Sequence, residues 1–377
     1  MKVKLCLATG IAGAVAATAA IAEIVIGVSV AYTGPQASLG VHYKNAFDLM
    51  PKTIGGEAVK FIILDNAGDA SNAAKQGRKL VTEDKVDVIV GSNGTPQTLA
   101  LSQVATESRT PMLALSPVSL PAENVHWTFI VPQPTELMMD AVAKDIQKRN
   151  LKTVAYIGYS DGWGDLVYKA LESHMGAAGY KVVTNERYAR NDTSVTGQVL
   201  KIIAANPQAV VVGGSGTGAA LPQIALRERG YKGPIYHNHG TVNAEFIKVG
   251  GKNVEGAIAP TGPVVVASEL PAGYATKALG EEFMKRYEST FNLGRNAFAA
   301  YSYDAVLLVA AAVPVALKKA KPGTPEFRAA LRDALENVKG VVGTHAVYTM
   351  TPTNHNGMDD RARVLVEVKD GQWRLIK

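Results

Sequence analysis

The sequence predicts an α/β fold made of two lobes, each with a mainly parallel β-sheet covered by helices. Runs rich in Val and Ile, such as residues 24–32, alternate with segments of helical periodicity, as expected for strands that are buried on both faces. The alternation restarts after the segment Val131-Pro132-Gln133-Pro134, which predicts a crossover between two similar units. A chain of 377 residues is also long enough to form two domains.

The first run of elements extends from residue 24 to this crossover. We expect strands at 24–32, 59–65, 86–91 and 111–115, and helices at 38–51, 70–83 and 96–108. Asp69 directly precedes the second of these helices and is a suitable N-cap residue.

The second run begins with a helix at 135–149. Strands are expected at 153–158, 181–187, 209–213 and 234–236, and further helices at 164–178, 194–205 and 217–229. A Gly/Pro-containing break at 259–263 predicts a return crossover, after which helices at 274–291, 296–318 and 325–336 complete the first lobe. The predicted first lobe is therefore 23–133 with 262–344, and the second is 134–261 with 345–377.

The C-terminal part of the chain has the character of hairpins. Strand-like segments at 345–350, 362–369 and 372–375 follow one another, and Asp370-Gly371 separates the last two. An Asp-Gly pair between two strands is a strong signal for a tight turn.

The N-terminus has the regions of a secretory signal peptide in their usual order. Lys2 and Lys4 precede an apolar stretch over residues 5–20, and Ala20-Ile21-Ala22 predicts cleavage before Glu23. The apolar stretch is shorter than the ~20 residues that span a bilayer. Residues 1–22 are therefore predicted to be removed on export to the periplasm. The single cysteine, Cys6, lies at the wrong end for a lipid anchor, so we expect a soluble mature protein.

Composition narrows the classes of function. Removal of residues 1–22 removes the only cysteine, which excludes disulfides and thiol chemistry from the mature chain. The formal net charge of +6 becomes +4 when Lys2 and Lys4 are lost, and charges of both signs are interspersed. Without a long basic run, binding to nucleic acid is not expected.

The loops that follow the predicted strands are candidates for a binding cleft, because ligands bind beyond the carboxyl ends of parallel strands. These loops are 33–40, 91–95, 116–120, 159–164, 213–218 and 237–241. They are rich in Gly, Ser, Thr and Asn, and Asp161 is their one carboxylate. Backbone N–H groups and hydroxyls near helix N-termini hold anions well. The cleft is therefore predicted to suit an anionic group.

At these loops the sequence resembles the branched-chain amino-acid-binding family of periplasmic receptors. The segments that carry the resemblance are IGVSVAYTGPQASL (26–39), KFIILDNAGD (60–69), TPMLALS (110–116) and YSYDA (301–305). The resemblance covers essentially the whole mature chain. It implies a type I periplasmic binding protein with two Rossmann-like lobes, a three-segment hinge and hinge closure on a ligand, which works with the membrane permease subunits of an ABC importer. We expect such a receptor to act as a monomer without a cofactor.

The resemblance also implies which residues contact the ligand. On the first lobe these are Ser38, Leu39, Asn93, Gly94, Thr95, Ser116, Val118 and Ser119; on the second they are Trp163, Ser215 and His239. Thr95 matches the hydroxyl that holds the ligand carboxylate, and Trp163 matches an aromatic residue that closes over the ligand. Ser38 is equally suited to capping the following helix.

Two positions depart from the pattern of amino-acid receptors. The ammonium-binding Tyr and Glu of the family correspond to Ser215 and His239, neither of which is a carboxylate. A buried ammonium without an acceptor is costly. We therefore hypothesise a carboxylate ligand without an α-amino group, such as a benzoate, a benzoylformate or a phenylpropenoate. A branched-chain amino acid remains the alternative, since Asp161 lies in a predicted cleft loop and could turn toward an ammonium.

Other classes of function have weaker signals. The Gly-rich segment 213–218 lacks the Gly-Lys-Ser/Thr ending of a nucleotide-binding loop, and His237 and His239 have no further ligand that would complete a metal site. An enzyme is not expected, because no GxSxG elbow and no paired carboxylates occur in the cleft loops. A ligand-sensing domain is the third hypothesis, and it would need an attached effector.

Overall fold

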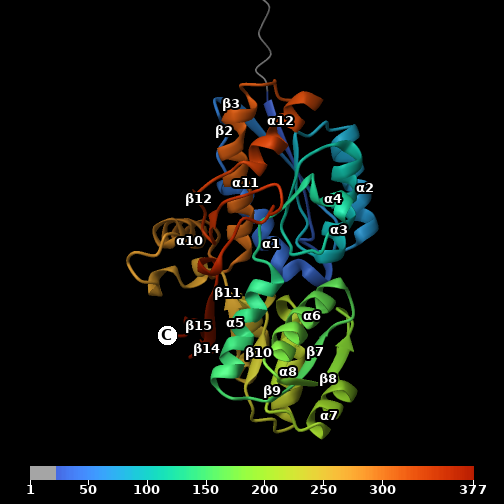
Figure 1. Cartoon of the computed structure of the whole chain (residues 1–377), viewed down its shortest axis with the longest axis vertical. Coiled ribbons are helices and arrows are strands. Elements are labelled where there is room, and N and C mark those ends of the chain that lie inside the picture. Colours follow the sequence, from blue (N-terminus) through green and yellow to red (C-terminus); the bar gives the residue numbers. More distant parts are fainter. Residues whose placement is uncertain (1–22) are drawn as a thin grey trace, which may run out of the picture.

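The computed structural model describes residues 23–377, which form two units one above the other (Figure 1). The first unit contains a six-stranded sheet in the order β2-β3-β1-β4-β5-β6. Its strands are β1 (Glu23–Val30), β2 (Thr53–Ile54), β3 (Glu57–Asp65), β4 (Val88–Gly91), β5 (Met112–Ala114) and β6 (Thr128–Ile130). All neighbours pair in parallel except the short β2, which is antiparallel to β3.

The second unit contains a seven-stranded sheet in the order β15-β14-β11-β10-β9-β7-β8. Its strands are β7 (Thr153–Tyr159), β8 (Lys181–Tyr188), β9 (Ala209–Gly213), β10 (Ile235–His237), β11 (Ile258–Thr261), β14 (Val364–Lys369) and β15 (Gln372–Leu375). β7 to β11 pair in parallel, and β14 and β15 add an antiparallel edge. The predicted α/β fold with two parallel sheets is thus confirmed.

Helices from both ends of the chain cover the first sheet. They are α1 (Ala37–Ala46), α2 (Ala70–Thr82), α3 (Thr95–Ser108), α4 (Ala122–Val125), α11 (Phe298–Ala316) and α12 (Pro325–Glu336). Helix α10 (Lys277–Phe291) lies beside this unit near the waist (Figure 1) and packs against the 3-10 helix at Pro263–Glu269. α2 packs beside α3, and α11 packs between α1 and α12. α11 is long and apolar enough to cross a membrane, but 67% of the residues in its 18-residue apolar stretch are buried inside the protein. It is therefore a core helix of the first unit.

The second sheet is covered by helices from the middle of the chain. They are α5 (Thr135–Lys148), α6 (Gly162–Ala177), α7 (Thr196–Ala204), α8 (Ala220–Glu228) and α9 (Ala244–Gly250). α5 packs against α6, and α8 packs against both α7 and α9. Short 3-10 helices lie between the elements: η1 (Gly34–Gln36), η2 (Phe47–Leu49), η3 (Gly216–Ala219), η4 (His239–Thr241), η5 (Gly251–Val254), η6 (Pro263–Glu269) and η7 (Asp360–Ala362).

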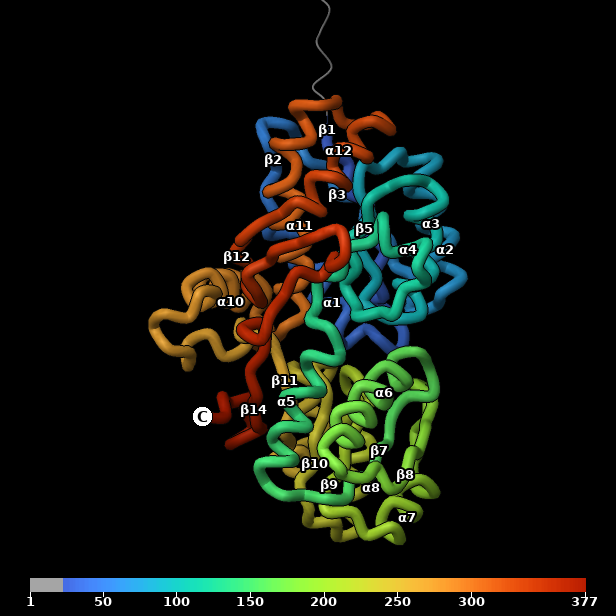
Figure 2. Tube along the Cα trace, viewed as in Figure 1, coloured from blue at the N-terminus to red at the C-terminus, as the bar shows by residue number. Residues whose placement is uncertain are grey.

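The chain passes between the two units three times, and the passages lie side by side at the waist (Figure 2). Gln133, in the first passage, donates from Nε2 to the carbonyl of Ala362 in the third, over 2.8 Å. A Cβ placed on Gly262, in the second passage, would lie 2.6 Å from the same Nε2. The three passages therefore pack against one another at Gln133.

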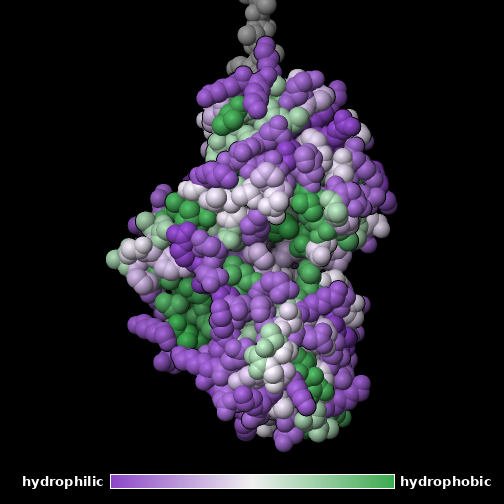
Figure 3. Space-filling model, viewed as in Figure 1, coloured by the Kyte–Doolittle hydropathy of each residue, from purple (hydrophilic) through white to green (hydrophobic). Residues whose placement is uncertain are grey.

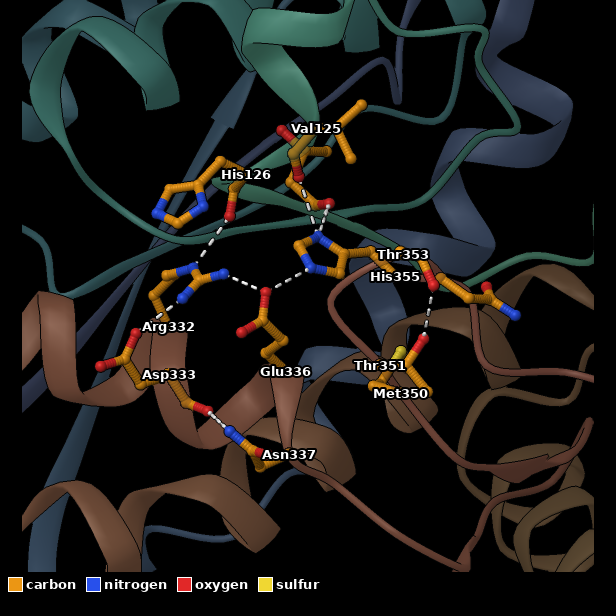
Figure 4. Close-up of polar contacts among 12 residues, drawn as sticks. Val125, His126, Arg332, Asp333, Glu336, Asn337, Met350, Thr351, Thr353 and His355 are labelled. Carbon is orange, nitrogen blue, oxygen red and sulfur yellow. Dashed lines mark hydrogen bonds and ion pairs between the residues drawn. The ribbon is translucent and has the colours of Figure 1, made fainter.

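Residues 344–356 pack on the first unit after its last helix. Tyr348 donates to the buried carboxylate of Asp304 on α11 over 2.9 Å. His355 contacts Glu336 through Nε2 (3.0 Å) and the carbonyl of Val125 through Nδ1 (2.8 Å) (Figure 4). The hairpin β12 (Val341–Val342) and β13 (Val347–Tyr348) is a separate small sheet. We retain the two-lobe division as a proposal, with 345–356 assigned by these contacts to the first lobe.

The final hairpin forms as the Asp-Gly signal predicts. Lys369 pairs with Gln372 across the turn. Asp370 and Gly371 have φ values of 53° and 68°, which a two-residue type I′ turn requires. The segment 345–350 contributes β13 to a different hairpin, because β13 pairs with β12, whereas β14 pairs with β11 and β15.

The face drawn in Figure 3 is mostly hydrophilic over both units. Hydrophobic residues on this face gather in patches near the waist. The apolar side chains of the sheets are instead buried, as in β9, where every residue is inaccessible to solvent. Both units therefore have a packed core of their own sheet and helices.

Candidate binding cleft

A cavity lies between the two units, at the carboxyl ends of the strands of both sheets. It encloses about 390 Å³ of space outside protein atoms, part of it open to solvent. The lining residues are Leu39, Tyr43, Asn93, Gly94, Thr95, Leu115, Ser116, Pro117, Pro132, Trp163, Arg190, Ser215, His239, Gly240, Phe298 and Tyr301. Its place between the two units suits a small ligand held by both.

The first wall of the cavity is built from loops after β1, β4 and β5. Asn93 accepts from the N–H of Ala31 at 2.7 Å and so ties two of these loops together. Thr95, at the start of α3, donates to the carbonyl of Pro117 (2.9 Å) and lies 3.1 Å from the hydroxyl of Ser116. Backbone N–H groups in the first turn of a helix have no acceptor within the helix. This end of the cavity therefore offers hydroxyls and N–H groups to an anion.

Trp163 forms the part of the second wall at the start of α6. Asp161 caps this helix by accepting from the N–H groups of Trp163 (3.0 Å) and Gly164 (3.3 Å). The indole Nε1 donates to the carbonyl of Gly214 at 3.2 Å. Trp163 is only 4% exposed. The ring is thus held from both ends, and its face is available to the cavity.

Arg190 brings a positive charge to the cavity from the loop after β8. Its Nε donates to Asp161 at 2.6 Å, and one terminal nitrogen donates to the hydroxyl of Ser215 at 3.2 Å. The guanidinium carbon lies 4.3 Å from the centre of the Tyr159 ring. These contacts fix the plane of the guanidinium, and Asp161 is already engaged by them.

The loop after β10 carries His239 into the cavity. Asn238 holds this loop, because its side chain accepts from the N–H of Gly240 (2.7 Å) and donates to the carbonyl of Gly214 (2.6 Å). His239 is 2% exposed and packs edge-on against Trp163, with 5.3 Å between ring centres. Burial lowers the pKa of His239 to about 3. Its imidazole is therefore neutral at physiological pH.

An aromatic surface closes the cavity near the waist. Tyr43 stacks on Tyr301 with 6.3 Å between ring centres, and Phe298 packs against Tyr43 at 5.7 Å. The hydroxyl of Tyr43 donates to Leu115 (3.0 Å) and that of Tyr301 to Gln133 (2.6 Å). Because both hydroxyls have acceptors in the protein, these rings present mainly their apolar surface to the cavity.

The two units also touch each other directly beside the cavity. The N–H of Thr217 in η3 donates to the hydroxyl of Ser38 at 3.4 Å. His42 on α1 contacts Glu245 on α9, with 3.2 Å between Nε2 and Oε2. A Cβ on Gly162 would lie 3.7 Å from the methyl group of Thr95. The two walls are thus in contact, and this is a closed arrangement.

The structure brings most of the predicted ligand residues together. Leu39, Asn93, Gly94, Thr95, Ser116, Trp163, Ser215 and His239 all line the cavity. Ser38 lies instead in the contact with Thr217, and Val118 and Ser119 are not among the lining residues. The ligand contacts of all these residues stay predictions.

Several lining residues were missed by sequence reasoning. Arg190 follows strand β8, so the rule that placed the other cleft loops would have found it if applied to that strand. Tyr43, Phe298 and Tyr301 lie on helices, where no strand-end signal exists. His237 is not among the residues that line the cavity, and its Nε2 lies 2.7 Å from the side-chain oxygen of Gln223. No group of residues within 23–377 has the arrangement of a metal site.

Comparison with known proteins places this architecture in a family. The sequence model of a family described as periplasmic binding protein matches residues 23–372. The Leu/Ile/Val-binding protein homolog 3 of Brucella melitensis biotype 1 is 25% identical over 350 residues, which is 89% of each chain. The crystal structure of an extracellular ligand-binding receptor from Rhodopseudomonas palustris HaA2 has 46% sequence identity and a TM-score of 0.93, covering 94% of this chain and all of that chain.

A more distant structure shares the fold alone. It is an ABC-transporter solute-binding protein from R. palustris in complex with benzoate, with 18% identity and a TM-score of 0.77, covering 94% of this chain and 95% of that chain.

The chain belongs to the periplasmic binding protein family. It is a solute-binding receptor of the type that serves ABC transporters, and the resemblance to the branched-chain amino-acid receptors is confirmed. Members of this family are receptors that bind small ligands and work with permeases, and they are not enzymes. The family places the protein in the periplasm. The predicted signal peptide, residues 1–22, lies outside the described residues.

Proposed function

We propose that this receptor binds a small aromatic carboxylate, such as an aromatic acid or aromatic keto acid, and delivers it to an ABC importer. The observation that carries the proposal is the charge of the cavity lining. It includes the guanidinium of Arg190 and no carboxylate. An anion therefore meets hydrogen-bond donors in the lining, whereas an α-ammonium meets no carboxylate among the lining residues.

Asp161, which lies close to the cavity, does not alter this preference for an anion over an ammonium. Asp161 is engaged by the Arg190 guanidinium and by two backbone N–H groups at the start of α6. Turning Asp161 toward an ammonium would break the helix cap and leave Arg190 without its partner. This acid supports the orientation of Arg190 better than it supports recognition of an amino acid.

The shape of the lining supports a flat apolar ligand body. Tyr43, Phe298 and Tyr301 offer ring surfaces at one side, and Trp163 offers another from the opposite unit. Planar rings pack well between aromatic side chains. A carboxylate at Thr95 and Ser116 would place an attached ring between these surfaces.

Closure is the proposed mechanism of capture. Thr95 and Ser116 belong to one unit, and Trp163 and Arg190 belong to the other. A ligand that contacts both walls binds the closed form better than the open form, and this difference in affinity shifts the equilibrium toward closure. The closed form is then the species presented to the permease.

Calorimetry on residues 23–377 tests the ligand class. Benzoate, benzoylformate and a phenylpropenoate are titrated beside leucine, with benzamide as a control that lacks the negative charge. We expect saturable binding of at least one of the acids, and none of benzamide or leucine. Tight leucine binding without binding of any aromatic acid would establish the amino-acid alternative instead.

A further inference from the structure

His239 differs from the other buried histidines of the second unit and the waist. His237 bonds to Gln223 through Nε2, and His345 lies 3.0 Å from the carbonyl of Ala297. Neither ring nitrogen of His239 has a hydrogen-bond partner among the described residues. Yet His239 is 2% exposed and lines the cavity. Two unpartnered polar atoms therefore belong to a side chain that lines the place where a ligand is expected.

The protonation state of His239 defines what these atoms require. Burial lowers its pKa to about 3, so the imidazole is neutral. A neutral imidazole has one N–H donor and one acceptor nitrogen. Leaving both unpaired in a buried site is unfavourable, since each would otherwise bond to water. A ligand that supplies a donor or an acceptor at this point removes that penalty, whereas a hydrocarbon edge does not.

His239 lies on the second wall of the cavity, toward the waist. His345 is close to His239, and it stacks on Tyr301 with 4.0 Å between ring centres. Thr95 lies on the first wall, where it approaches Gly162 of the second unit. A ligand whose carboxylate meets Thr95 presents its remaining part to the wall that carries His239.

The orientation of His239 is fixed by its surroundings. Trp163 contacts its edge at an interplanar angle of 82°. Asn238, immediately before it, is fully buried and bonds to the carbonyls of Val212 and Gly214. A side chain held in this way can select a ligand by hydrogen bonding, because it cannot turn to find another partner.

We infer that His239 is a specificity-determining residue, which selects ligands with a hydroxyl or carbonyl oxygen at the end remote from the carboxylate. This inference rests on the proposed function, because it assumes a carboxylate at the Thr95 end. It adds that a plain hydrocarbon ring is a poor ligand, since it leaves both imidazole nitrogens unpaired.

The test compares two acids that differ by one oxygen, benzoate and 4-hydroxybenzoate, or the matching pair of phenylpropenoates. Wild-type protein is expected to bind the hydroxylated member roughly 10- to 100-fold more tightly. His239→Leu removes both polar atoms at similar volume and should bring this ratio close to one. His239→Gln keeps a donor and an acceptor and should restore part of the preference. Circular dichroism and thermal unfolding check that the variants are folded.

The possible outcomes separate this inference from the proposed function. Equal affinity of wild-type protein for both members of a pair overturns the inference and leaves the proposed function standing. An unchanged ratio in His239→Leu, with the variant folded, also overturns the inference. If neither member binds and leucine does, the proposed function is wrong, and the inference about His239 is wrong as well because it depends on that function.

Discussion

His42 and Glu245 connect the two units of the receptor, with 3.2 Å between Nε2 and Oε2. His42 is almost fully buried on α1, and its other ring nitrogen lies 2.7 Å from the hydroxyl of Tyr287. Glu245 on α9 is partly exposed, and its contact with His42 lowers its carboxyl pKa against the opposing effect of burial. The pair can exist only while the units are together, so it contributes to the closed state alone.

Glu245→Gln is expected to weaken ligand binding by about two- to fivefold. The substitution replaces the carboxylate of the pair by an amide, and a partly exposed contact of this kind contributes roughly 0.5–1 kcal/mol. Calorimetry measures the affinity, and small-angle scattering measures closure. The control is Glu281→Gln, which removes an acid that pairs only with Lys277 on the same helix. Equal effects of the two substitutions would show that the pair does not favour closure.

Arg190→Met is expected to weaken binding of an aromatic carboxylate by roughly 10- to 100-fold, since charge-assisted hydrogen bonds are the stronger ones. Arg187→Met is the matched control, because Arg187 lies on β8, just before the loop that carries Arg190, pairs with Asp165 and does not line the cavity. Titration of both variants with the same acid gives the comparison. If Arg190→Met retains wild-type affinity, Arg190 does not meet the carboxylate.

Trp163→Phe is expected to lower ligand affinity about tenfold while the protein stays folded. The smaller ring loses the hydrogen bond from Nε1 to Gly214 and part of the surface that faces the cavity. Trp163→Ala would lose more affinity, but a buried Trp→Ala change costs about 3–5 kcal/mol of stability. Affinity by fluorescence titration and stability by urea unfolding are measured together. Unchanged affinity in a folded Trp163→Ala protein would contradict the role of a lid.

Two glycines of helix α6 are expected to respond in opposite directions to alanine. A Cβ on Gly164 would lie 1.9 Å from the carbonyl oxygen of Tyr159, whereas a Cβ on Gly176 would meet no atom within 4 Å. Gly164→Ala should destabilise the protein by roughly 3 kcal/mol. Gly176→Ala should stabilise it by about 0.5–1 kcal/mol through helix propensity. Urea unfolding distinguishes the two, and a neutral Gly164→Ala would refute the close approach of α6 to β7.

Stability is expected to fall as pH drops from 6.5 toward 3. Burial lowers the pKa of His237, His239 and His345 from 6.5 to about 3. In this window the unfolded chain binds protons that the folded chain does not, so acid favours unfolding. Burial raises the pKa of Asp304 to about 6, which acts in the opposite direction between 3.8 and 6.

The destabilising effect of the three histidines at acid pH exceeds the stabilising effect of Asp304. Each histidine accounts for roughly 2 kcal/mol between pH 6.5 and 5, from 1.36 kcal/mol per pKa unit. Urea unfolding at pH 7.0 and 5.0 measures the net change in the free energy of unfolding. Equal or greater stability at pH 5.0 would mean that these histidines are not buried as neutral groups.

Much of the fold could be predicted from local signals. The run at 209–213 forms β9 with those bounds, because a continuous Val-rich segment followed by Gly-Gly has few alternatives. Helix α12 begins at Pro325 and is capped by Thr324, which accepts from the N–H of Phe327. Where the hydrophobic period, the cap and the breaker agree, the element is determined locally.

Other elements depend on contacts that no local signal carries. The strands β2 and β6 contain two and three residues, too few to show a period. The segment at 259–263 was interpreted as a Gly/Pro break, yet its first three residues belong to β11 (Ile258–Thr261), which pairs with β10 and β14. Pairing partners, and not intrinsic preference, decide such short segments.

Some residues of the candidate cleft could likewise be predicted from local signals, and others depend on the fold. Loop residues such as Thr95 and Ser215 were found because they follow parallel strands. Phe298 and Tyr301 lie on a helix more than 200 residues farther along the chain than Thr95, and the return of the chain to the first sheet brings them to the cavity. The state of His239 likewise depends on the packing around it, which the sequence does not display.

The antiparallel edge of the second sheet has a consequence for biosynthesis. Strands β14 and β15 come from the last 14 residues of the chain, yet β14 pairs with β11 over four residues. Until residue 364 has been synthesised, β11 is an unprotected edge. A nascent chain therefore cannot complete the sheet of its second unit until residues 364–375 have been synthesised.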